Sequence, residues 1–227
     1  MLKGGTALRA SAGGGGVRKR MAQYAAWREL RRLVPGAGPR PDRRGWAVAP
    51  DLLLHLARTV RQRRPALVVE LGSGVSTCWL ALALRAFDVP GRLVSLEHSA
   101  PYAQRTRAQV RAAGVADLAE VRPAPLTEVV FDGERWPWYA RTAWADLTGC
   151  ELLVVDGPPG TTGPLARYPA VPLLGERLAP GATVVLDDYD RPDEREAVAR
   201  WRRRHPAWSF RAVPHAKGTA LLQLPWQ

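Results

Sequence analysis

Short apolar runs alternate with longer amphipathic segments along most of this 227-residue chain. The runs are rich in Val and Leu and predict strands, at 66–71, 91–97, 118–124, 151–156 and 182–188. The segments between them carry helical patterns, at 76–87, 101–113, 137–146 and 166–178. Because the runs are apolar on both faces, they are typical of a parallel sheet covered by helices. The alternation predicts an α/β, Rossmann-like doubly wound fold.

The last part of the chain departs from this alternation. A helical pattern at 192–204 is followed by two strand-like runs, at 208–214 and 217–224. Only His215 and Ala216 join these runs, and such a short link cannot hold a crossover helix. We therefore expect a mostly parallel seven-stranded sheet that finishes with a C-terminal antiparallel hairpin.

Three segments of different composition divide the chain. Residues 1–16 are glycine-rich and of low complexity, so we expect a disordered basic tail. Residues 17–45 predict a basic amphipathic helix, over 17–34, and then a linker rich in Pro and Gly. The remainder starts with a helix that Asp51 can cap, and it predicts a single domain over 46–227.

The net charge of +12 belongs entirely to the beginning of the chain. Residues 1–64 hold 15 Lys and Arg against three acids, whereas residues 65–227 hold 18 of each sign. A basic extension of this kind can bind RNA, a membrane surface or an acidic partner, and it can equally be a solvated arm. No aromatic and basic motif of an RNA-binding module accompanies it.

Cysteine content and hydropathy bear on location. No apolar run approaches the roughly 18 residues that a membrane span needs, so no transmembrane segment is expected. Cys78 and Cys150 have no metal-ligand spacing and are interpreted as buried thiols. Free thiols are typical of a reducing compartment, which favours a cytoplasmic protein. The pattern leaves the oligomeric state open.

The stretch VVELGSGVST, residues 68–77, places a carboxylate ahead of two glycines at the end of the first strand. Such a turn lets the backbone approach a ligand, and the helix that begins near Ser76 directs N–H groups at it. A dinucleotide site would want a third glycine where Thr77 stands, and Glu70 would repel a pyrophosphate. A ligand with a cationic amino-acid end, such as S-adenosylmethionine, suits Glu70 better. A dehydrogenase is the weaker alternative.

A second acid, Glu97, ends the second predicted strand in the stretch VSLEH. A carboxylate at this place can accept hydrogen bonds from both hydroxyls of a ribose. Surface charge is the alternative explanation for this residue.

Taken with LLVVDGPPG and ATVVLDD, these motifs resemble class I S-adenosylmethionine-dependent methyltransferases, over about residues 48–224. The resemblance implies that the glycine turn holds the methionine end of the ligand and that Glu97 holds the ribose. In the segment PAPLTE the usual acid near adenine is missing, and Pro125 and Leu126 could supply an apolar wall instead. The cofactor-binding residues implied are Glu70, Gly72, Ser73, Gly74, Ser76, Thr77, Glu97, His98, Leu126 and Asp156.

Three acids follow the fourth and fifth predicted strands, namely Asp156, Asp187 and Asp188. Strand ends in a parallel sheet meet at one edge, so these carboxylates should converge and repel one another unless a cation or a basic group intervenes. Mg²⁺ is one candidate, because it prefers oxygen ligands. The alternative is that Asp156 caps a Gly-Pro turn and that Asp188 caps or pairs with Arg191.

The same three acids resemble the metal ligands of cation-dependent O-methyltransferases of the catechol and macrolide-sugar types. The resemblance implies transfer of a methyl group to an oxygen of a small molecule or glycan, with Asp156, Asp187 and His98 as candidate catalytic residues. The chain departs from the catechol type at Pro159, where that type carries a lysine base. Other candidate bases are Tyr168, Asp190 and His215.

The segment ERWPWYARTAW, residues 134–144, predicts an aromatic lid over the acceptor, with Trp136 and Trp138 as its solvent-side members. Core packing is the alternative for Trp144. Arg167 and Tyr168 could reach the same mouth, or they could lie on the surface.

Two further functions stay open at this point. The chain could be an RNA methyltransferase that docks through its basic N-terminal arm, although nucleic acid is the less favoured partner because the main domain is neutral. It could also be a non-catalytic module that only binds the cofactor. An amino-group methyltransferase acting on nucleic acid fits poorly, because Gly157 and Gly160 interrupt the motif it would need.

Overall fold

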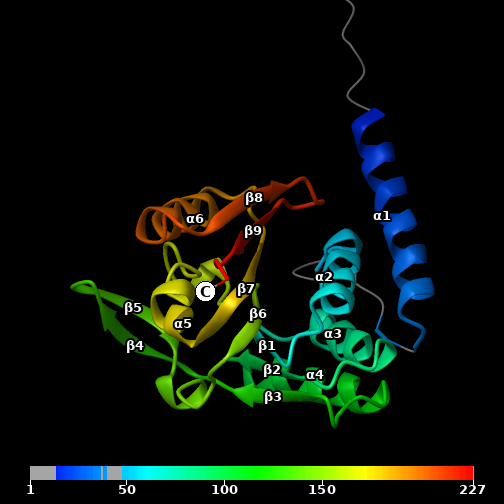
Figure 1. Ribbon diagram of the computed structural model, residues 1–227, viewed down its shortest axis with the longest axis horizontal. Helices are drawn as coiled ribbons and strands as arrows, with labels where there is room; N and C mark the ends of the chain where they lie inside the picture. Colours follow the sequence, from blue (N-terminus) through cyan, green and yellow to red (C-terminus); the bar gives the residue numbers. More distant parts are fainter. Residues whose placement is uncertain (1–13, 37, 40–47, 227) are drawn as a thin grey trace, which may run out of the picture.

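The computed structural model describes residues 14–36, 38–39 and 48–226, and its centre is one seven-stranded sheet in the order β3-β2-β1-β6-β7-β9-β8 (Figure 1). Strand β9 runs antiparallel to both of its neighbours, and the other neighbouring pairs are parallel. The predicted doubly wound sheet with a closing hairpin is therefore confirmed. The strands are β1 Leu67–Leu71, β2 Arg92–Glu97, β3 Ala119–Pro123, β6 Cys150–Val155, β7 Leu178–Asp187, β8 Ser209–Val213 and β9 Thr219–Gln223.

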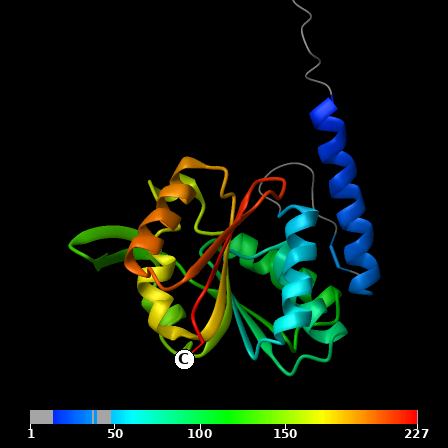
Figure 2. The ribbon, with the colours of Figure 1, turned by 45° about the horizontal axis from the view of Figure 1, so that its top comes forward.

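Helices cover both faces of this sheet (Figures 1 and 2). One apolar layer joins α1, α2, α3 and α4 to side chains such as Val68 and Val154, and the other joins α5 and α6 to their neighbours Val69 and Val155. Adjacent residues of a strand point to opposite faces, so the all-apolar strands serve both layers. The helices are α1 Gly14–Leu33, α2 Pro50–Arg63, α3 Val75–Ala86, α4 Ala100–Ala112, α5 Ala170–Leu174 and α6 Pro192–Arg204.

The basic N-terminal helix is attached to the domain by its second half. Leu30 is fully buried, and Trp27 meets Trp79 of α3 edge to face with 5.3 Å between ring centroids. Helix α1 begins at Gly14, inside the segment that was expected to be a tail, while residues 1–13 and most of the predicted linker lie outside the described residues. None of the described helices has the length and apolar character of a membrane-crossing segment.

Asp51 does not cap α2 as predicted, because the helix begins one residue earlier at Pro50 and its N-cap is Ala49. The carboxylate instead accepts hydrogen bonds from Gln23 Nε2 at 2.6 Å and from the backbone N–H of Ala216 at 2.7 Å. Asp51 therefore ties α1 and α2 to the turn between β8 and β9.

The predicted helix over 137–146 is wrong. The chain forms a separate hairpin there, with β4 Leu126–Phe131 paired to β5 Glu134–Tyr139, and then one 3₁₀ turn at Arg141–Ala143. Asp132 and Gly133 form the two-residue loop, and both have positive φ, which is the geometry that an Asp-Gly pair favours in hairpins.

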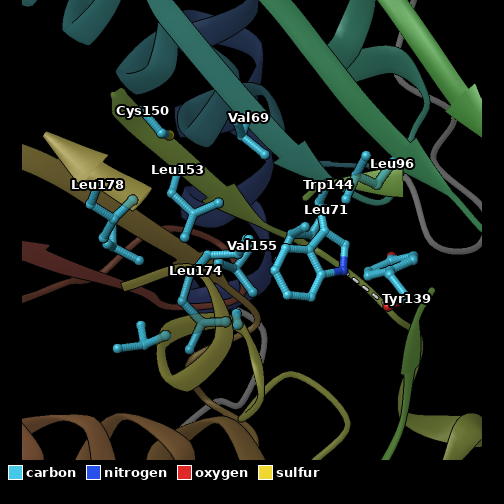
Figure 3. Packing of buried hydrophobic residues seen from close by; sticks show 14 of the residues in the cluster. Val69, Leu71, Leu96, Tyr139, Trp144, Cys150, Leu153, Val155, Leu174 and Leu178 are labelled. Atoms are coloured by element: carbon cyan, nitrogen blue, oxygen red, sulfur yellow. Dashed lines mark hydrogen bonds between the residues drawn. The ribbon is translucent and has the colours of Figure 1, made fainter. Parts of the chain in front are cut away.

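The aromatic side chains of this hairpin pack inward. Trp138 is fully buried and Trp136 is 8% exposed, so the prediction that they form a solvent-side lid is wrong. The indole Nε1 of Trp144 donates to the backbone oxygen of Tyr139 at 3.1 Å, beside Leu71 (Figure 3). The hairpin thus contributes to the same apolar layer as α5 and α6.

Helix α5 is much shorter than the helix predicted over 166–178. It spans Ala170–Leu174 and continues only as a 3₁₀ turn over Gly175–Arg177. Pro164 and Pro169 precede it, and proline lacks the N–H that a longer helix would need. Residues 163–169 consequently form a loop, and this loop carries Arg167 into the interior.

Candidate functional site

The candidate site lies where the carboxyl ends of β1, β2, β6 and β7 meet. The chain continues from β1 to its neighbour β2 on one side, while β6 pairs with β1 on the other, so strand order reverses between β1 and β6. Ligands of open α/β sheets bind at such a point. Backbone hydrogen bonds hold the loops there, from Gly72 N to Leu96 O at 2.9 Å and from Asp156 N to Leu71 O at 3.0 Å.

The two glycines of the first loop differ in what their surroundings require. Gly72 has φ +89°, and a Cβ on it would lie 3.2 Å from the backbone oxygen of Asp156, so this position needs glycine for the fold itself. A Cβ on Gly74 would meet nothing within 4 Å. The space beside Gly74, at the start of α3, is therefore open, and contact of either glycine with a ligand stays a prediction.

Glu70 lies beneath this loop and is completely buried. Its Oε2 accepts a hydrogen bond from Thr77 Oγ1 at 2.6 Å, and Thr77 Oγ1 in turn accepts one from the N–H of Gly74 at 2.9 Å. Burial raises the pKa of Glu70 to about 7, although the hydroxyls of Ser76, Thr77 and Ser95 lower it. The Oε1 atom has no hydrogen-bond partner among the described residues, so it is left for a further donor.

Glu97 is connected to the same loop. Its Oε2 accepts hydrogen bonds from both the backbone N–H and the hydroxyl of Ser73, each at 3.0 Å, and its Oε1 accepts one from Ser99 N at 2.8 Å. His98 Nδ1 lies 3.1 Å from Oε1. A carboxylate has about four acceptor positions, so Glu97 is held in one orientation and can still accept from a ligand. The structure thus brings together Glu70 and Glu97, the two acids predicted to bind the cofactor. We call these two acids and the loop 72–74 the first half-site, and the three aspartates after β6 and β7 the other half-site.

Leu126 begins β4 and lies half-buried, whereas Pro125 is exposed. The segment before it is joined to the site by a hydrogen bond from Ala124 N to Glu97 O at 2.8 Å. Leu126 is therefore near the strand end that carries Glu97, and its role as an adenine wall stays a prediction.

The three aspartates converge as predicted. One carboxylate oxygen from each of Asp156, Asp187 and Asp188 lies within 4.8 Å of the other two. Asp187 and Asp188 are 2% and 3% exposed. Asp187 Oδ1 accepts a hydrogen bond from Asp188 N at 2.7 Å. This bond fixes the carboxylate of Asp187 relative to the backbone of Asp188.

Two buried or half-buried cations lie among these acids. Arg167, 5% exposed, directs one guanidinium nitrogen at Asp156 Oδ1 at 3.1 Å and at Asp188 Oδ2 at 2.9 Å. Lys217 Nζ lies 2.9 Å from Asp187 Oδ2 and 3.0 Å from Asp188 Oδ1. The structure therefore places basic groups among the acids, which was one of the two arrangements considered from the sequence. Arg167 lies in the interior instead of on the surface, and sequence reasoning missed Lys217.

Proton affinity differs within this cluster. Burial first, and Asp187 second, raise the pKa of Asp156 to about 7. Burial also acts to raise the pKa of Asp188, but Arg167 and Lys217 outweigh it and hold that pKa below its usual value. The pKa of Lys217 is raised despite burial, chiefly by Asp187 and Asp156, so the ammonium stays charged.

A magnesium ion does not fit beside these side chains as they stand. Mg²⁺ needs oxygen ligands at about 2.0–2.1 Å. Oxygens of Asp187 and Asp188 are already in contact with an ammonium, and Asp188 also pairs with Arg191 at 3.1 Å. An ion would have to displace Lys217 to use both carboxylates, and the predicted magnesium site stays a prediction.

The candidate bases occupy different surroundings. Tyr168 packs in the core, and the centroid of its ring lies 5.2 Å from that of Trp136. His215 Nδ1 lies 2.9 Å from Thr219 Oγ1, and burial lowers its pKa. Asp190 is exposed, and only His98 borders the first half-site.

Tyr139 is a site residue that the sequence reasoning missed. It is fully buried, and a Cβ on Gly157 would lie only 2.5 Å from its hydroxyl. Burial, and then the charge of Glu97, raise its pKa well above the usual value. The Asp-Gly pair at the tip of its hairpin was the available signal, because it marks the strand that delivers Tyr139 to the site.

A cleft of about 220 Å³ adjoins the aspartate cluster. Arg167 and Glu194, which line it, also belong to the charged network, with 3.7 Å between Arg167 Nε and Glu194 Oε1. The rest of the lining comes from the loop after β6 and the start of α6, including Leu165, Arg191 and Pro192.

Several known proteins are similar to this chain. It is 38% identical over 80 residues to a catechol O-methyltransferase from Mycobacterium tuberculosis, a match that spans about a third of each chain, 34% in both cases. The O-methyltransferase TomG from Streptomyces achromogenes, solved in complex with SAM, superposes with a TM-score of 0.60 at 20% identity and covers 90% of this chain and 89% of its own. A methyltransferase from Podospora anserina, solved with SAH, gives a TM-score of 0.64 at 15% identity, with 98% and 99% covered.

These structures share the fold, and the family follows from a sequence match. The model of a methyltransferase domain family matches residues 69–189, more than half of the chain. This range starts in β1, next to Glu70, and ends just after the aspartates of β7, so it includes both halves of the site. The chain therefore belongs to this methyltransferase domain family.

Proposed function

We propose that the protein transfers a methyl group from S-adenosylmethionine to a hydroxyl oxygen of a small molecule. The observation that carries the proposal is the open space at Gly74 next to Glu97, whose carboxylate is held in place by Ser73. A ribose hydroxyl can donate to the acceptor position that Ser73 and Ser99 leave free on that carboxylate. Glu70 supports this loop through Oε2, which accepts from Thr77, and its Oε1, which lacks a partner among the described residues, is available to a donor at the cationic methionine end.

The residues at the other half-site would receive the acceptor. When bound, S-adenosylmethionine supplies an electrophilic methyl group on a sulfonium sulfur. In such a transfer the acceptor oxygen would bond to the methyl carbon as the carbon–sulfur bond breaks, the electron pair would stay on sulfur, and the hydroxyl proton would pass to water. Side chains of this chain contribute by fixing the acceptor in line with that carbon, because alignment supplies most of the acceleration in such displacements.

The size of the cleft supports a small acceptor. About 220 Å³ lie beside the aspartates, which is room for a small hydroxylated molecule or a single sugar. The relationship to a catechol O-methyltransferase points the same way. We further propose a cytoplasmic location, for which the free and buried thiols of Cys78 and Cys150 are the support.

A methylation assay tests this proposal. The purified protein is incubated with methyl-labelled S-adenosylmethionine and a panel of catechols, phenols and sugars, and labelled ether and S-adenosylhomocysteine are measured. We expect one class to be methylated and Glu97→Ala to lose the activity. Tight donor binding without turnover on any acceptor would favour the non-catalytic cofactor-binding module instead.

A further inference from the structure

We propose that Lys217 supplies from within the chain the positive charge that a metal ion would bring to the aspartates, so that the protein works without a divalent cation. The side chain of Lys217 contacts the two acids that would otherwise bind such an ion, Asp187 and Asp188, at 2.9 and 3.0 Å. The catalytic part of this inference rests on the proposed methyl transfer, whereas the part about metal binding does not.

The ammonium group is built into the fold by the turn that carries it. Lys217 O accepts a hydrogen bond from Asp190 N at 3.1 Å, and Gly218 O accepts one from Tyr189 N at 3.1 Å, so the turn is bonded to the loop that follows β7. On its other side, Ala216 N donates to Asp51 Oδ2 at 2.7 Å. Three backbone contacts from three successive residues therefore fix where the lysine side chain begins.

Gly218 makes this arrangement specific. It has φ +70°, and a Cβ there would lie 2.5 Å from Asp190 Oδ1. Only glycine allows the turn to approach the loop after β7 so closely. The close approach is what brings the side chain of Lys217 to the carboxylates.

Charge balance within the cluster points to the same role. Each of the three aspartates contacts a cation, because Arg167 pairs with Asp156 and Asp188, Lys217 with Asp187 and Asp188, and Arg191 adds a third positive charge at Asp188. A fourth acid, Glu194, lies 3.7 Å from both arginines. Buried carboxylates that already have cationic partners gain little from an added ion, and a divalent cation beside Lys217 would meet like-charge repulsion. The three aspartates thus already have cationic partners from this chain.

Lys217 also has a donor left for a substrate. An ammonium has three N–H groups, and two of them are directed at Asp187 and Asp188. Its side chain is 30% exposed, so the oxygen of a methyl acceptor can reach the third N–H group. There it would stabilise the negative charge that develops on that oxygen as the hydroxyl proton leaves to water.

Metal binding tests the inference directly. Wild type, Lys217→Met and Lys217→Arg are stripped with a chelator, and Mn²⁺ is added and followed by electron paramagnetic resonance and by the shift in Tm. We expect no bound Mn²⁺ in wild type or Lys217→Arg, and bound Mn²⁺ with a raised Tm in Lys217→Met. Lys19→Met, which removes an exposed lysine of α1, is the matched control and should behave as wild type.

Turnover gives the second readout. Wild-type turnover should be unchanged in excess chelator, and Lys217→Met without metal should lose about a hundredfold in kcat with little change in the KM for the donor. Mn²⁺ bound by wild type, and lost on Asp187→Asn, would overturn the inference, as would a Lys217→Met protein that neither binds Mn²⁺ nor loses turnover. If Lys217→Met fails to fold by circular dichroism, the Mn²⁺ result on wild type decides.

The two proposals fail in different ways. S-adenosylhomocysteine binding is measured on the same samples, and its absence would refute the proposed methyl transfer. The Mn²⁺ measurement needs neither donor nor acceptor, so it decides the role of Lys217 even then.

Discussion

At the scale of single residues, the two glutamates of the first half-site do different work. Glu97 is held by Ser73 and Ser99 through three hydrogen bonds, which leave about one acceptor position for direct contact with a ligand. Glu70 is fully buried and bonded to Thr77, which accepts from Gly74 N. Glu70 therefore acts first on the shape of the loop, and its charge is costly to the folded state.

The pH dependence of stability should reveal that cost. The pKa of Glu70 in the fold, about 7, lies above its ordinary 4.5, so the folded protein holds this proton more tightly than the unfolded chain. Its contribution to the free energy of unfolding is full below about pH 4.5 and is lost as the pH rises towards 7. Glu70→Gln cannot ionise, so over that range its free energy of unfolding should fall by about 3 kcal/mol less than that of wild type.

Urea denaturation of the ligand-free proteins at a series of pH values checks this expectation. Curves for wild type and Glu70→Gln that stay parallel from pH 4.5 to 7 would contradict the raised pKa.

The two glycines of the loop offer a matched pair of substitutions. Gly72→Ala should lower the free energy of unfolding by about 1–3 kcal/mol, because its φ of +89° is strained for alanine and the backbone of Asp156 is close. Gly74→Ala should leave stability nearly unchanged and weaken binding of S-adenosylhomocysteine, because the methyl group enters open space. Calorimetry and urea denaturation separate the two effects, and a Gly74→Ala protein with wild-type affinity would show that the ligand lies elsewhere.

Several site residues could be predicted because their positions follow from the ends of strands. Glu70, Glu97 and the three aspartates end or follow buried strands, and parallel strands bring such residues to one edge. The cations could not be predicted in this way. Lys217 reaches the site only because the turn between β8 and β9 folds onto the loop after β7, and Arg167 because its loop enters the interior.

At the scale of elements, the hairpin β4–β5 is the main difference from the sequence-based prediction. Residues 137–146 were predicted to form a helix between two strands of the sheet, yet Asp132 and Gly133 specify a tight turn between two further strands. The strands β1, β2 and β6 of the main sheet were predicted well because each is a short apolar run that is buried along almost its whole length. The strands β4 and β5 mix exposed and packed side chains, so they give no such run.

Burial of Trp138 makes this hairpin part of the core. The side chain is completely buried between Tyr139 and Trp144, with ring centroids 5.2 and 5.9 Å away. Trp138→Ala should therefore lower the free energy of unfolding by about 3–5 kcal/mol. Val130→Ala, on the same hairpin but 63% exposed, should change it by no more than about 0.5 kcal/mol.

Urea denaturation measures both values. If Trp138→Ala were as stable as Val130→Ala, the hairpin would not be packed on the sheet in solution, and the aromatic lid predicted from the sequence would regain support.

At the scale of the whole molecule, the excess of positive charge lies in a segment whose described helix is packed onto the domain. The excess of positive charge lies in residues 1–64, and within the described part of that range α1 is fixed to α2 and α3 by Trp27 and Leu30 while residues such as Met21 and Tyr24 stay exposed. Residues 65–227 are neutral overall, and the three aspartates of the site contact internal cations. RNA docking through the arm stays a prediction, separate from the chemistry of the site.

The central claim is that the loop between β1 and α3, together with Glu97, binds S-adenosylmethionine. Titration calorimetry of the purified protein with S-adenosylhomocysteine tests it most directly, since the demethylated product cannot react. We predict binding to one site per chain by wild type, and loss of that binding in Glu97→Ala with an unchanged fold by circular dichroism. Absence of binding by folded wild-type protein, for both the product and the donor, would contradict the account.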